Sequence, residues 1–311
     1  MNSFLKLKPT HKDYIWGGEK LKEIYDDCRE MNIVAESWVL SSHKDGENRI
    51  LDGEFAGCGF SEYLKKVGKD VLGENMENKK DFPILIKFID AKKDLSIQVH
   101  PDDEYALLNE GQNGKTEMWY ILDCEPGACI YYGFKKNVSR EEARDAIENG
   151  TFTDLLNSVP VHKGDAFFIP AGMVHAIGAG AFICEIQQNS NVTYRVYDYN
   201  RTDKDGNKRE LHIEKALDTM NLERTEIGKM NSGDVLTECN YFKVVREKIE
   251  SSKEIMLNCK SFLSVIVTEG CGKFIYGENI SEFKKGDSFF FPAEDGNFRV
   301  EGDGELILTT V

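Results

Sequence analysis

The chain has 311 residues, of which 41% are hydrophobic and 30% charged, and its formal net charge at pH 7 is −15. This length allows a large buried core and predicts two domains, or one large β domain with additions. Because no basic run offsets the negative charge, the composition argues against a nucleic-acid or anionic-membrane partner, although a local cluster of Lys and Arg could still bind a small anion.

The N-terminal segment and the cysteines predict a cytoplasmic protein. Residues Met1–Lys6 contain no apolar signal sequence, and no stretch of the chain approaches the length of a transmembrane helix. Eight cysteines are scattered without a Cys-x-x-Cys pair. We therefore expect free, mostly buried thiols rather than disulfides or a cysteine-based zinc site.

Short strands and turns are expected over the first 56 residues. Glu36–Leu40 predicts a strand, and Ser41–Asn48 predicts a polar turn in which we expect His43 to be a solvated loop residue. A helix is predicted over Ser61–Val71, with Ser61 as its N-cap, because apolar residues follow at helical spacing.

A central strand is predicted over Phe82–Ile89, which is too apolar to be exposed. Lys87 lies inside this run. The pattern leaves open whether its side chain extends outward to solvent or points into a functional pocket.

The next predicted strand, Leu95–His100, carries candidate metal ligands. Successive side chains of a strand point to opposite faces, so Gln98 and His100 project the same way, with Ser96 on the same side. A second short strand carries Glu117. An imidazole, a carboxylate and a carboxamide that converge on one pocket suit a divalent metal of the zinc class, and such a site needs at least one more ligand.

Helices are predicted in the middle of the chain, after strands that break at Glu125–Gly127. Ser139 opens a helix with a capping box, and this helix runs to about Asn149. A second short helix is expected over Thr153–Asn157. Because these helices interrupt a strand-rich chain, we interpret residues 139–158 as an insertion.

An internal repeat is the most informative feature of the sequence. Residues 163–171 read KGDAFFIPA and residues 285–293 read KGDSFFFPA, which differ at two of nine positions. Chance similarity of this kind is improbable, so the repeat implies two homologous β domains, with residues 207–230 as the link between them. His175 of the first copy falls opposite Asn297, and the second copy has no Gln-x-His strand. We therefore expect a metal site in the first domain alone.

His175 is the candidate for the missing ligand. It ends the repeated Pro-Ala-Gly turn, where the mouth of a β-barrel would lie. With the barrel that the repeat implies, Gln98, His100, Glu117 and His175 form a candidate metal site. The remaining histidines are interpreted as solvated or structural: His11, His43, His162 and His212.

Three cationic side chains accompany this set in the sequence: Lys87, Lys115 and Arg195. Lys115 lies two residues before Glu117 and hence on the same face of the strand. The residues alone leave two alternatives open, because Lys115 could be a solvated loop residue and Arg195 could form a surface salt bridge with Asp198.

Four motifs stand out in the sequence: Gln98-x-His100-Pro101, Lys115-x-Glu117-Met118-Trp119, Pro170-Ala171-Gly172-x-x-His175 and Tyr194-Arg195. Together they resemble type I phosphomannose isomerase, also called mannose-6-phosphate isomerase. The similarity extends from Trp16–Gly18 through Asp198, with a degenerate second half also expected, and the length resembles the short bacterial branch of the family. The Gln-x-His pair with a Glu and a distant His differs from the His-x-His arrangement of other cupins.

The resemblance implies a mainly β fold of two cupin-type jelly-roll barrels with a small helical insertion. Residues 1–230 would form the catalytic domain, with the insertion near 139–158, and residues 231–311 a degenerate, metal-free domain. The resemblance also implies that the chain interconverts mannose 6-phosphate and fructose 6-phosphate through a cis-enediol, so that a phosphorylated hexose is its partner. One Zn²⁺ would be held by Gln98, His100, Glu117 and His175.

The resemblance further implies roles for the neighbouring residues. Arg195 matches the family's catalytic arginine. The base stays open among Glu185, Lys115 and a zinc-bound water. Asn191 stands where close relatives are expected to carry Asp. The positions that match the lining of the family's substrate pocket are Ser96, Lys87, Lys115 and Glu185.

Two other classes of function compete with the isomerase. A non-catalytic sugar-binding or regulatory cupin would be favoured by loss of the ligands, but all four candidates are present. An iron-dependent oxygenase on the same barrel generally uses two histidines and one carboxylate, so Gln98 argues against it.

Overall fold

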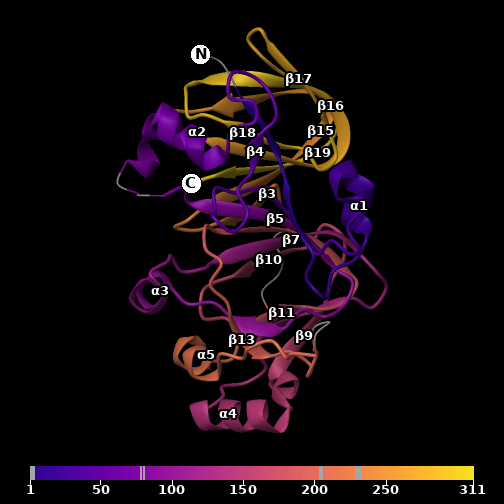
Figure 1. Ribbon diagram of the computed structural model, residues 1–311, viewed down its shortest axis with the longest axis vertical. Helices are drawn as coiled ribbons and strands as arrows, with labels where there is room; N and C mark the ends of the chain where they lie inside the picture. The colour runs from indigo at the N-terminus through magenta and orange to yellow at the C-terminus, as the bar shows by residue number, and fades with distance from the viewer. Residues whose placement is uncertain (1–3, 78, 80, 203–205, 228–232) are drawn as a thin grey trace.

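The computed structural model describes residues 4–77, 79, 81–202, 206–227 and 233–311. Three antiparallel sheets account for most of it, and the helices are short and lie around them (Figure 1). The predicted mainly β class is therefore confirmed. Among the described residues, no helix is long and apolar enough to cross a membrane.

The eight-stranded sheet combines the two ends of the chain. Its strand order is β14-β15-β19-β16-β18-β1-β4, and β17 pairs with β16. The N-terminal strand β1 pairs with β18, so the N-terminal segment is part of the sheet that the C-terminal residues build. The strands are β1 (Leu5–Lys8), β4 (Arg49–Ile50), β14 (Val235–Glu238), β15 (Lys243–Leu257), β16 (Leu263–Tyr276), β17 (Asn279–Lys284), β18 (Ser288–Phe291) and β19 (Gly296–Thr310).

The six-stranded sheet has the order β10-β7-β12-β5-β3-β2. Every residue of β5 and β12 is buried, as expected for central strands. The predicted central strand is confirmed, although it begins at Ile84 rather than Phe82. The strands are β2 (Thr10–Lys12), β3 (Glu36–Leu40), β5 (Ile84–Ala91), β7 (Glu117–Cys124), β10 (Ala166–Ile169) and β12 (Ala181–Gln188).

The five-stranded sheet has the order β13-β6-β11-β8-β9 and faces the six-stranded sheet. One hydrophobic cluster joins the two, with Trp119 and Ile183 from one sheet packed with Ile130 and Ile177 from the other. The space between these sheets is where the predicted ligands meet. The strands are β6 (Ile97–Val99), β8 (Cys129–Phe134), β9 (Leu156–Pro160), β11 (His175–Ile177) and β13 (Tyr194–Tyr197).

The helices cover the edges and one end of the sheets, with α4 and α5 together at the lower end of Figure 1. Ser139 caps α4 by accepting a hydrogen bond from Glu142 N at 3.0 Å, as predicted. The helices are α1 (Lys20–Ile24), α2 (Phe60–Val67), α3 (Asp103–Glu110), α4 (Arg140–Asn149) and α5 (Ile213–Thr219), and the 3-10 turns are η1 (Asp26–Cys28), η2 (Lys69–Leu72), η3 (Glu74–Met76) and η4 (Phe152–Leu155).

Two local predictions were wrong. Ser61 is not the N-cap of α2, because Gly59 holds that position and the carboxylate of Glu47 accepts the Ser61 N–H. The helix expected over 153–157 is the 3-10 turn η4, which ends where β9 begins.

The cysteines are free, as predicted, but most are not fully buried. Cys28 and Cys184 are buried and Cys271 is exposed, whereas the other five are intermediate.

The sequence repeat is also a structural repeat. Gly164 N donates to the carbonyl of Ile121 over 2.8 Å, and Gly286 N donates to the carbonyl of Val267 over 2.9 Å. Both glycines adopt a positive φ, 91° and 93°, which other residues rarely adopt. The same turn therefore feeds β10 in one copy and β18 in the other.

Candidate metal centre and active site

Three neighbouring strands of the five-stranded sheet bring Gln98, His175 and Arg195 together. Gln98 of β6 is directly opposite His175 of β11 and also opposite Arg195 of β13. Directly opposite residues in antiparallel strands project from the same face, so the three side chains share one side of the sheet.

Glu117 meets this row from the facing sheet, as the first residue of β7. Its Oε1 lies 3.4 Å from Nε2 of His175, and its Oε2 lies 3.5 Å from Nε2 of His100. The side-chain amide of Gln98 lies 3.4 Å from the same His175 nitrogen, and rotation of that amide brings either its oxygen or its nitrogen there. The structure thus brings all four predicted ligands together.

The spacing of these donor atoms fits a zinc-class ion. An ion with tetrahedral bonds of about 2.0–2.2 Å holds neighbouring donors roughly 3.4 Å apart. The observed separations have this size, and the donor atoms of His100, Glu117 and His175 lie within 4.8 Å of one another. Glu117 Oε1 is buried without a hydrogen-bond partner. An unpaired buried carboxylate oxygen is costly unless a cation lies beside it.

Both histidines present the correct nitrogen for binding a metal. Nδ1 of His100 donates to the carbonyl of Val192 over 2.9 Å, and Nδ1 of His175 donates to the carbonyl of Met173 over 2.8 Å. Since each Nδ1 carries the proton, each Nε2 keeps an unprotonated lone pair that can bind a cation. Burial lowers the pKa of His175 to about 4 and the pKa of His100 well below 6.5, so both rings are neutral at pH 7.

The two lysines point into the site, and neither is solvated. Lys87 Nζ lies 3.1 Å from Glu185 and 3.7 Å from Glu36. Lys115 Nζ donates to Nε2 of His100 over 3.0 Å and also contacts Glu117. The side chains of the two lysines are 6% and 3% exposed, so the solvent-exposed alternatives for both are wrong.

The buried charges do not balance. Three carboxylates, Glu36, Glu117 and Glu185, accompany the two ammonium groups of Lys87 and Lys115. The carboxyl groups of this cluster thus outnumber its amino groups by one. Burial and the charge of Glu185 raise the pKa of Glu117. Burial alone would also raise the pKa of Glu185, but Lys115 and Lys87 outweigh it and hold that pKa low.

Glu36 and Trp38 belong to the site although the sequence did not single them out. Trp38, Lys87, Glu185 and Trp119 follow one another across β3, β5, β12 and β7. Trp38 Nε1 donates to Glu36 over 2.6 Å, and Trp119 Nε1 donates to Glu185 over 3.0 Å. Glu36 and Trp38 are two positions apart in one strand, so their side chains share a face. This spacing was the signal in the sequence that could have identified them.

Arg195 is anchored beside Gln98. Its Nε donates to Ser96 Oγ over 3.2 Å, and its Nη1 donates to the carbonyl of Glu210 over 2.9 Å. Asp198 binds the guanidinium groups of Arg201 and Arg209. The alternative of a surface salt bridge between Arg195 and Asp198 is therefore wrong.

The other histidines are not among the four candidate metal ligands. His43 is 9% exposed and packs against the ring of Trp38, so the solvated position expected for it is wrong. His11 bridges Ser37 and Asp27. His212 N donates to the carbonyl of Arg195. His162 is largely exposed.

Asn191 also lies outside the donor set. Its side-chain amide donates to Asp45 Oδ2 over 3.1 Å in an exposed contact. The structure therefore assigns it no contact with the four ligands.

The second copy of the repeat carries aliphatic residues at the matching positions. Ile169 pairs with Glu117, and its counterpart Phe291 pairs with Leu263. Continuing this register across the sheet places Leu308 at the position of Glu185 and Val245 at that of Lys87. The second copy therefore has no charged side chain at these three positions.

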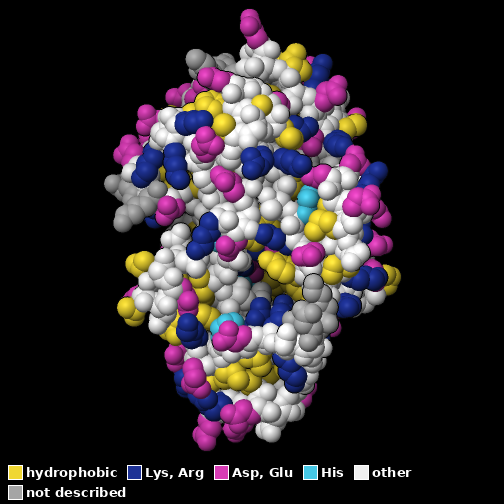
Figure 2. Space-filling view, in the orientation of Figure 1, with side chains coloured by type: hydrophobic (Ala, Val, Ile, Leu, Met, Phe, Trp, Pro, Cys, Tyr) yellow, Lys and Arg dark blue, Asp and Glu magenta, His cyan; other side chains and the backbone are white. Residues whose placement is uncertain are grey.

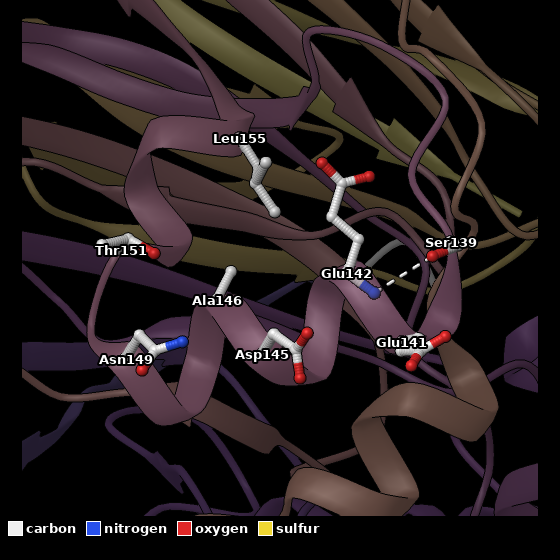
Figure 3. A pocket seen from close by; sticks show the side chains of 8 residues that line it. All are labelled: Ser139, Glu141, Glu142, Asp145, Ala146, Asn149, Thr151 and Leu155. Carbon is white, nitrogen blue, oxygen red and sulfur yellow. Dashed lines mark hydrogen bonds between the residues drawn. The ribbon is translucent and has the colours of Figure 1, made fainter.

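Two cavities elsewhere in the described part of the chain, one along α4 and one beside β16 and β17, are lined by none of these residues. On the face in Figure 2 the surface is hollowed near the level of β10 and β11, with Lys and Arg side chains above and below the hollow. A separate cavity of about 450 Å³ lies along α4, where Glu141, Glu142 and Asp145 line it together with Leu155 (Figure 3). Its acidic lining and its position along α4 separate it from the candidate metal centre.

Comparisons with known proteins agree on one family. The model of the phosphomannose isomerase type I catalytic domain matches residues 4–126, and that of the mannose-6-phosphate isomerase cupin domain matches residues 233–311. The mannose-6-phosphate isomerase ManA of Bacillus subtilis is 40% identical over 98% of each chain. The mannose-6-phosphate isomerase of Streptococcus mutans is 36% identical over 95% of this chain and 94% of its own. The crystal structure of the mannose 6-phosphate isomerase from Bacillus subtilis superposes with a TM-score of 0.90 at 35% identity, covering 99% of this chain and 100% of that one.

Proposed function

Because the chain belongs to the type I phosphomannose isomerases, we propose that it interconverts mannose 6-phosphate and fructose 6-phosphate at one zinc site. Gln98, His100, Glu117 and His175 would hold the ion. The observation that carries this proposal is the buried convergence of two neutral imidazoles, an amide and a carboxylate oxygen that has no hydrogen-bond partner.

We also propose that the fold comprises two cupin-type jelly-roll barrels. Residues 1–230 would be the catalytic unit and residues 231–311 the metal-free unit. The cupin family model over residues 233–311 supports this division, as do the aliphatic residues Leu263 and Leu308. Because β1 pairs with β18, the N-terminal strand also belongs to the sheet of the second unit.

The reaction moves a proton between C2 and C1 of the open sugar through a cis-enediol. A bound Zn²⁺ supplies positive charge that stabilises the negative charge developing on the carbonyl oxygen. With one carboxylate and three neutral donors, the four ligands would cancel one of the two positive charges of the ion and leave a net positive charge.

Arg195 is proposed as the catalytic arginine. Ser96 and the carbonyl of Glu210 hold its guanidinium beside Gln98 while leaving other N–H groups free to bind a sugar oxygen. The group is half-buried, so its hydrogen bonds to a developing oxyanion are stronger than they would be in water.

Ser96, Lys87, Lys115 and Glu185 are proposed to line the substrate pocket. Glu185 is ionised at neutral pH because Lys115 and Lys87 hold its pKa low, and a carboxylate can accept the C–H proton. Lys115 in its neutral amine form and a zinc-bound water are the other candidate bases. Lys115 lies against both His100 and Glu117. The carboxylate partners of both lysines orient them toward the site. A cytoplasmic location stays a prediction.

A direct test compares turnover of mannose 6-phosphate by the zinc-loaded, chelator-treated and zinc-restored protein. We expect chelation to abolish turnover and zinc to restore it. Glu117→Gln should lose both zinc and turnover, whereas Glu142→Gln on the exposed face of α4 should retain both. Zinc-loaded protein that binds the sugar phosphate without converting it would instead support a sugar-binding cupin.

A further inference from the structure

Residues 114–116 lead into β7 and deliver its first residue to the metal centre. They precede the strand, so hydrogen bonds from elsewhere must fix them. Gly114 N donates to Oδ1 of Asp103 over 2.8 Å, and Thr116 N donates to Oε1 of Gln188 over 2.8 Å. Gln188 N in turn donates to the carbonyl of Thr116 over 3.0 Å.

Asp103, the first residue of α3, is where these contacts meet. Its Oδ1 also accepts from Nε2 of Gln188 at 2.9 Å, and its Oδ2 accepts from the hydroxyl of Tyr241 at 2.8 Å. Tyr241 lies in the turn between β14 and β15 of the eight-stranded sheet. One continuous set of hydrogen bonds thus runs from that sheet to the segment beside Glu117.

A close backbone approach at Gly114 fixes the same contact sterically. A Cβ atom on Gly114 would lie 2.4 Å from the carbonyl carbon of Asp102 and 2.5 Å from the nitrogen of Asp103. The segment therefore packs directly against the start of α3, and a shift of one would move the other.

The segment is also tied to the strands that carry the two histidines. Thr116 Oγ1 accepts from the backbone N–H of Ala171 at 3.3 Å, and Gly172 N donates to the carbonyl of His100 over 2.8 Å. Ala171 and Gly172 belong to the turn that leads to His175. The position of residues 114–116 is therefore coupled to the positions of His100, Glu117 and His175.

We propose that Tyr241 and Asp103 are positioning residues through which the metal-free C-terminal unit holds Glu117 in its place as a metal ligand. The inference rests on the proposed metal-dependent function. It assigns the second unit a task in the first unit's site, although that unit has lost the ligands at its own matching positions.

Tyr241→Phe tests the link, and Tyr120→Phe is its matched control. The hydroxyl of Tyr120 also crosses to the eight-stranded sheet, where it donates to Glu305 over 2.9 Å without touching residues 114–116. Two quantities are measured: the zinc dissociation constant by competition with a chelator, and amide hydrogen exchange in the metal-free protein. We expect Tyr241→Phe to weaken zinc binding about 3- to 10-fold and to speed exchange at Gly114 about fivefold. Tyr120→Phe should leave both quantities within about twofold.

Two variants of Asp103 separate positioning from general destabilisation. Asp103→Ala removes every acceptor and should weaken zinc binding about 10- to 100-fold. Asp103→Asn keeps an oxygen for Gly114 and Gln188 and an amide that can donate to Tyr241, so its zinc affinity should return to within about threefold of the parent.

Equal effects of Tyr241→Phe and Tyr120→Phe, or no effect of Tyr241→Phe on either quantity, would overturn the positioning role. Zinc affinity and hydrogen exchange are read without any turnover. A protein that shows the expected shifts but no isomerase activity would therefore contradict the proposed function and still support this link.

Discussion

Two backbone carbonyls decide which nitrogen of each candidate ligand histidine faces the candidate metal centre. Val192 and Met173 accept the Nδ1 protons of His100 and His175. A sequence pattern identifies the histidines as candidates, but it does not reveal these carbonyls, because they come from segments far apart or from a turn whose geometry is set by packing. The tautomers are thus a property of the folded chain.

Arg195 gives the sharpest prediction for a single residue. Arg195→Ala should lower kcat by roughly 10²- to 10³-fold, because it removes donors that would stabilise a developing oxyanion. The zinc content should stay normal, since Arg195 contacts Ser96 and Glu210 rather than the metal donors. Steady-state kinetics and metal analysis of the same preparation measure both quantities.

Arg144→Ala is the control for Arg195→Ala. Arg144 lies on α4 and pairs with Glu214 at the exposed end of the molecule. Its loss should change neither kcat nor zinc content. If Arg195→Ala retained the parent's turnover, Arg195 would have no part in the mechanism.

At the scale of elements, the repeated turn is held by a glycine in each copy. Gly164→Ala should destabilise the protein by roughly 1–2 kcal/mol, because a Cβ is strained at a φ of 91°. Gly286→Ala should cost more, since its Cβ would also lie 2.2 Å from Ile24 Cγ2. Denaturant unfolding of both variants measures the difference.

Lys285→Ala in the same turn is the control, because it changes an exposed side chain and keeps the backbone hydrogen bonds. Its free energy of unfolding should stay within about 0.5 kcal/mol of the parent. If both glycine variants were as stable as the parent, the turn would not need a positive φ.

Helix α2 provides a pH-dependent prediction through Tyr63. Burial raises the pKa of this phenol to about 12. Between pH 10 and pH 12 the unfolded chain releases the Tyr63 proton and the folded chain retains it, so the free energy of unfolding falls as the pH rises. Two pKa units correspond to about 3 kcal/mol.

Tyr63→Phe isolates this contribution from the other tyrosines. The phenol is already half-ionised at pH 10 in the unfolded chain and only half-ionised at pH 12 in the folded chain, so the variant should lose about 2 kcal/mol less than the parent over this range, as measured by denaturant unfolding at each pH. Parallel pH curves for the two proteins would mean that the Tyr63 phenol ionises in the folded state at its ordinary pKa.

The starts of α2 and α4 illustrate what local sequence can predict. Ser139 and Glu142 are neighbours on one turn, so their cap follows from spacing alone. The α2 N-terminus instead uses the carboxylate of Glu47, which is fourteen residues away and arrives through tertiary packing. Rules for helix N-caps consider only residues next to the helix, so they would select Ser61 rather than Glu47.

At the scale of the whole molecule, the repeat and the ligand motifs were visible because they are written in contiguous residues. Two other contacts were not visible in the sequence. The ion pair joins Glu36 to Lys87, 51 residues away, and the hydrogen bond joins Asp103 to Tyr241, 138 residues away. The pairing of the N-terminal β1 with β18 was hidden for the same reason. Long-range pairing depends on the completed fold.

The central claim is that one ion lies between Gln98, His100, Glu117 and His175. X-ray diffraction at the zinc absorption edge, on crystals of the zinc-loaded protein, tests it most directly. The account predicts one anomalous peak about 2.0–2.2 Å from Nε2 of both histidines, a Glu117 carboxylate oxygen and the Gln98 amide oxygen. A fully occupied zinc peak at any other place in the chain, with none between these four side chains, would contradict it.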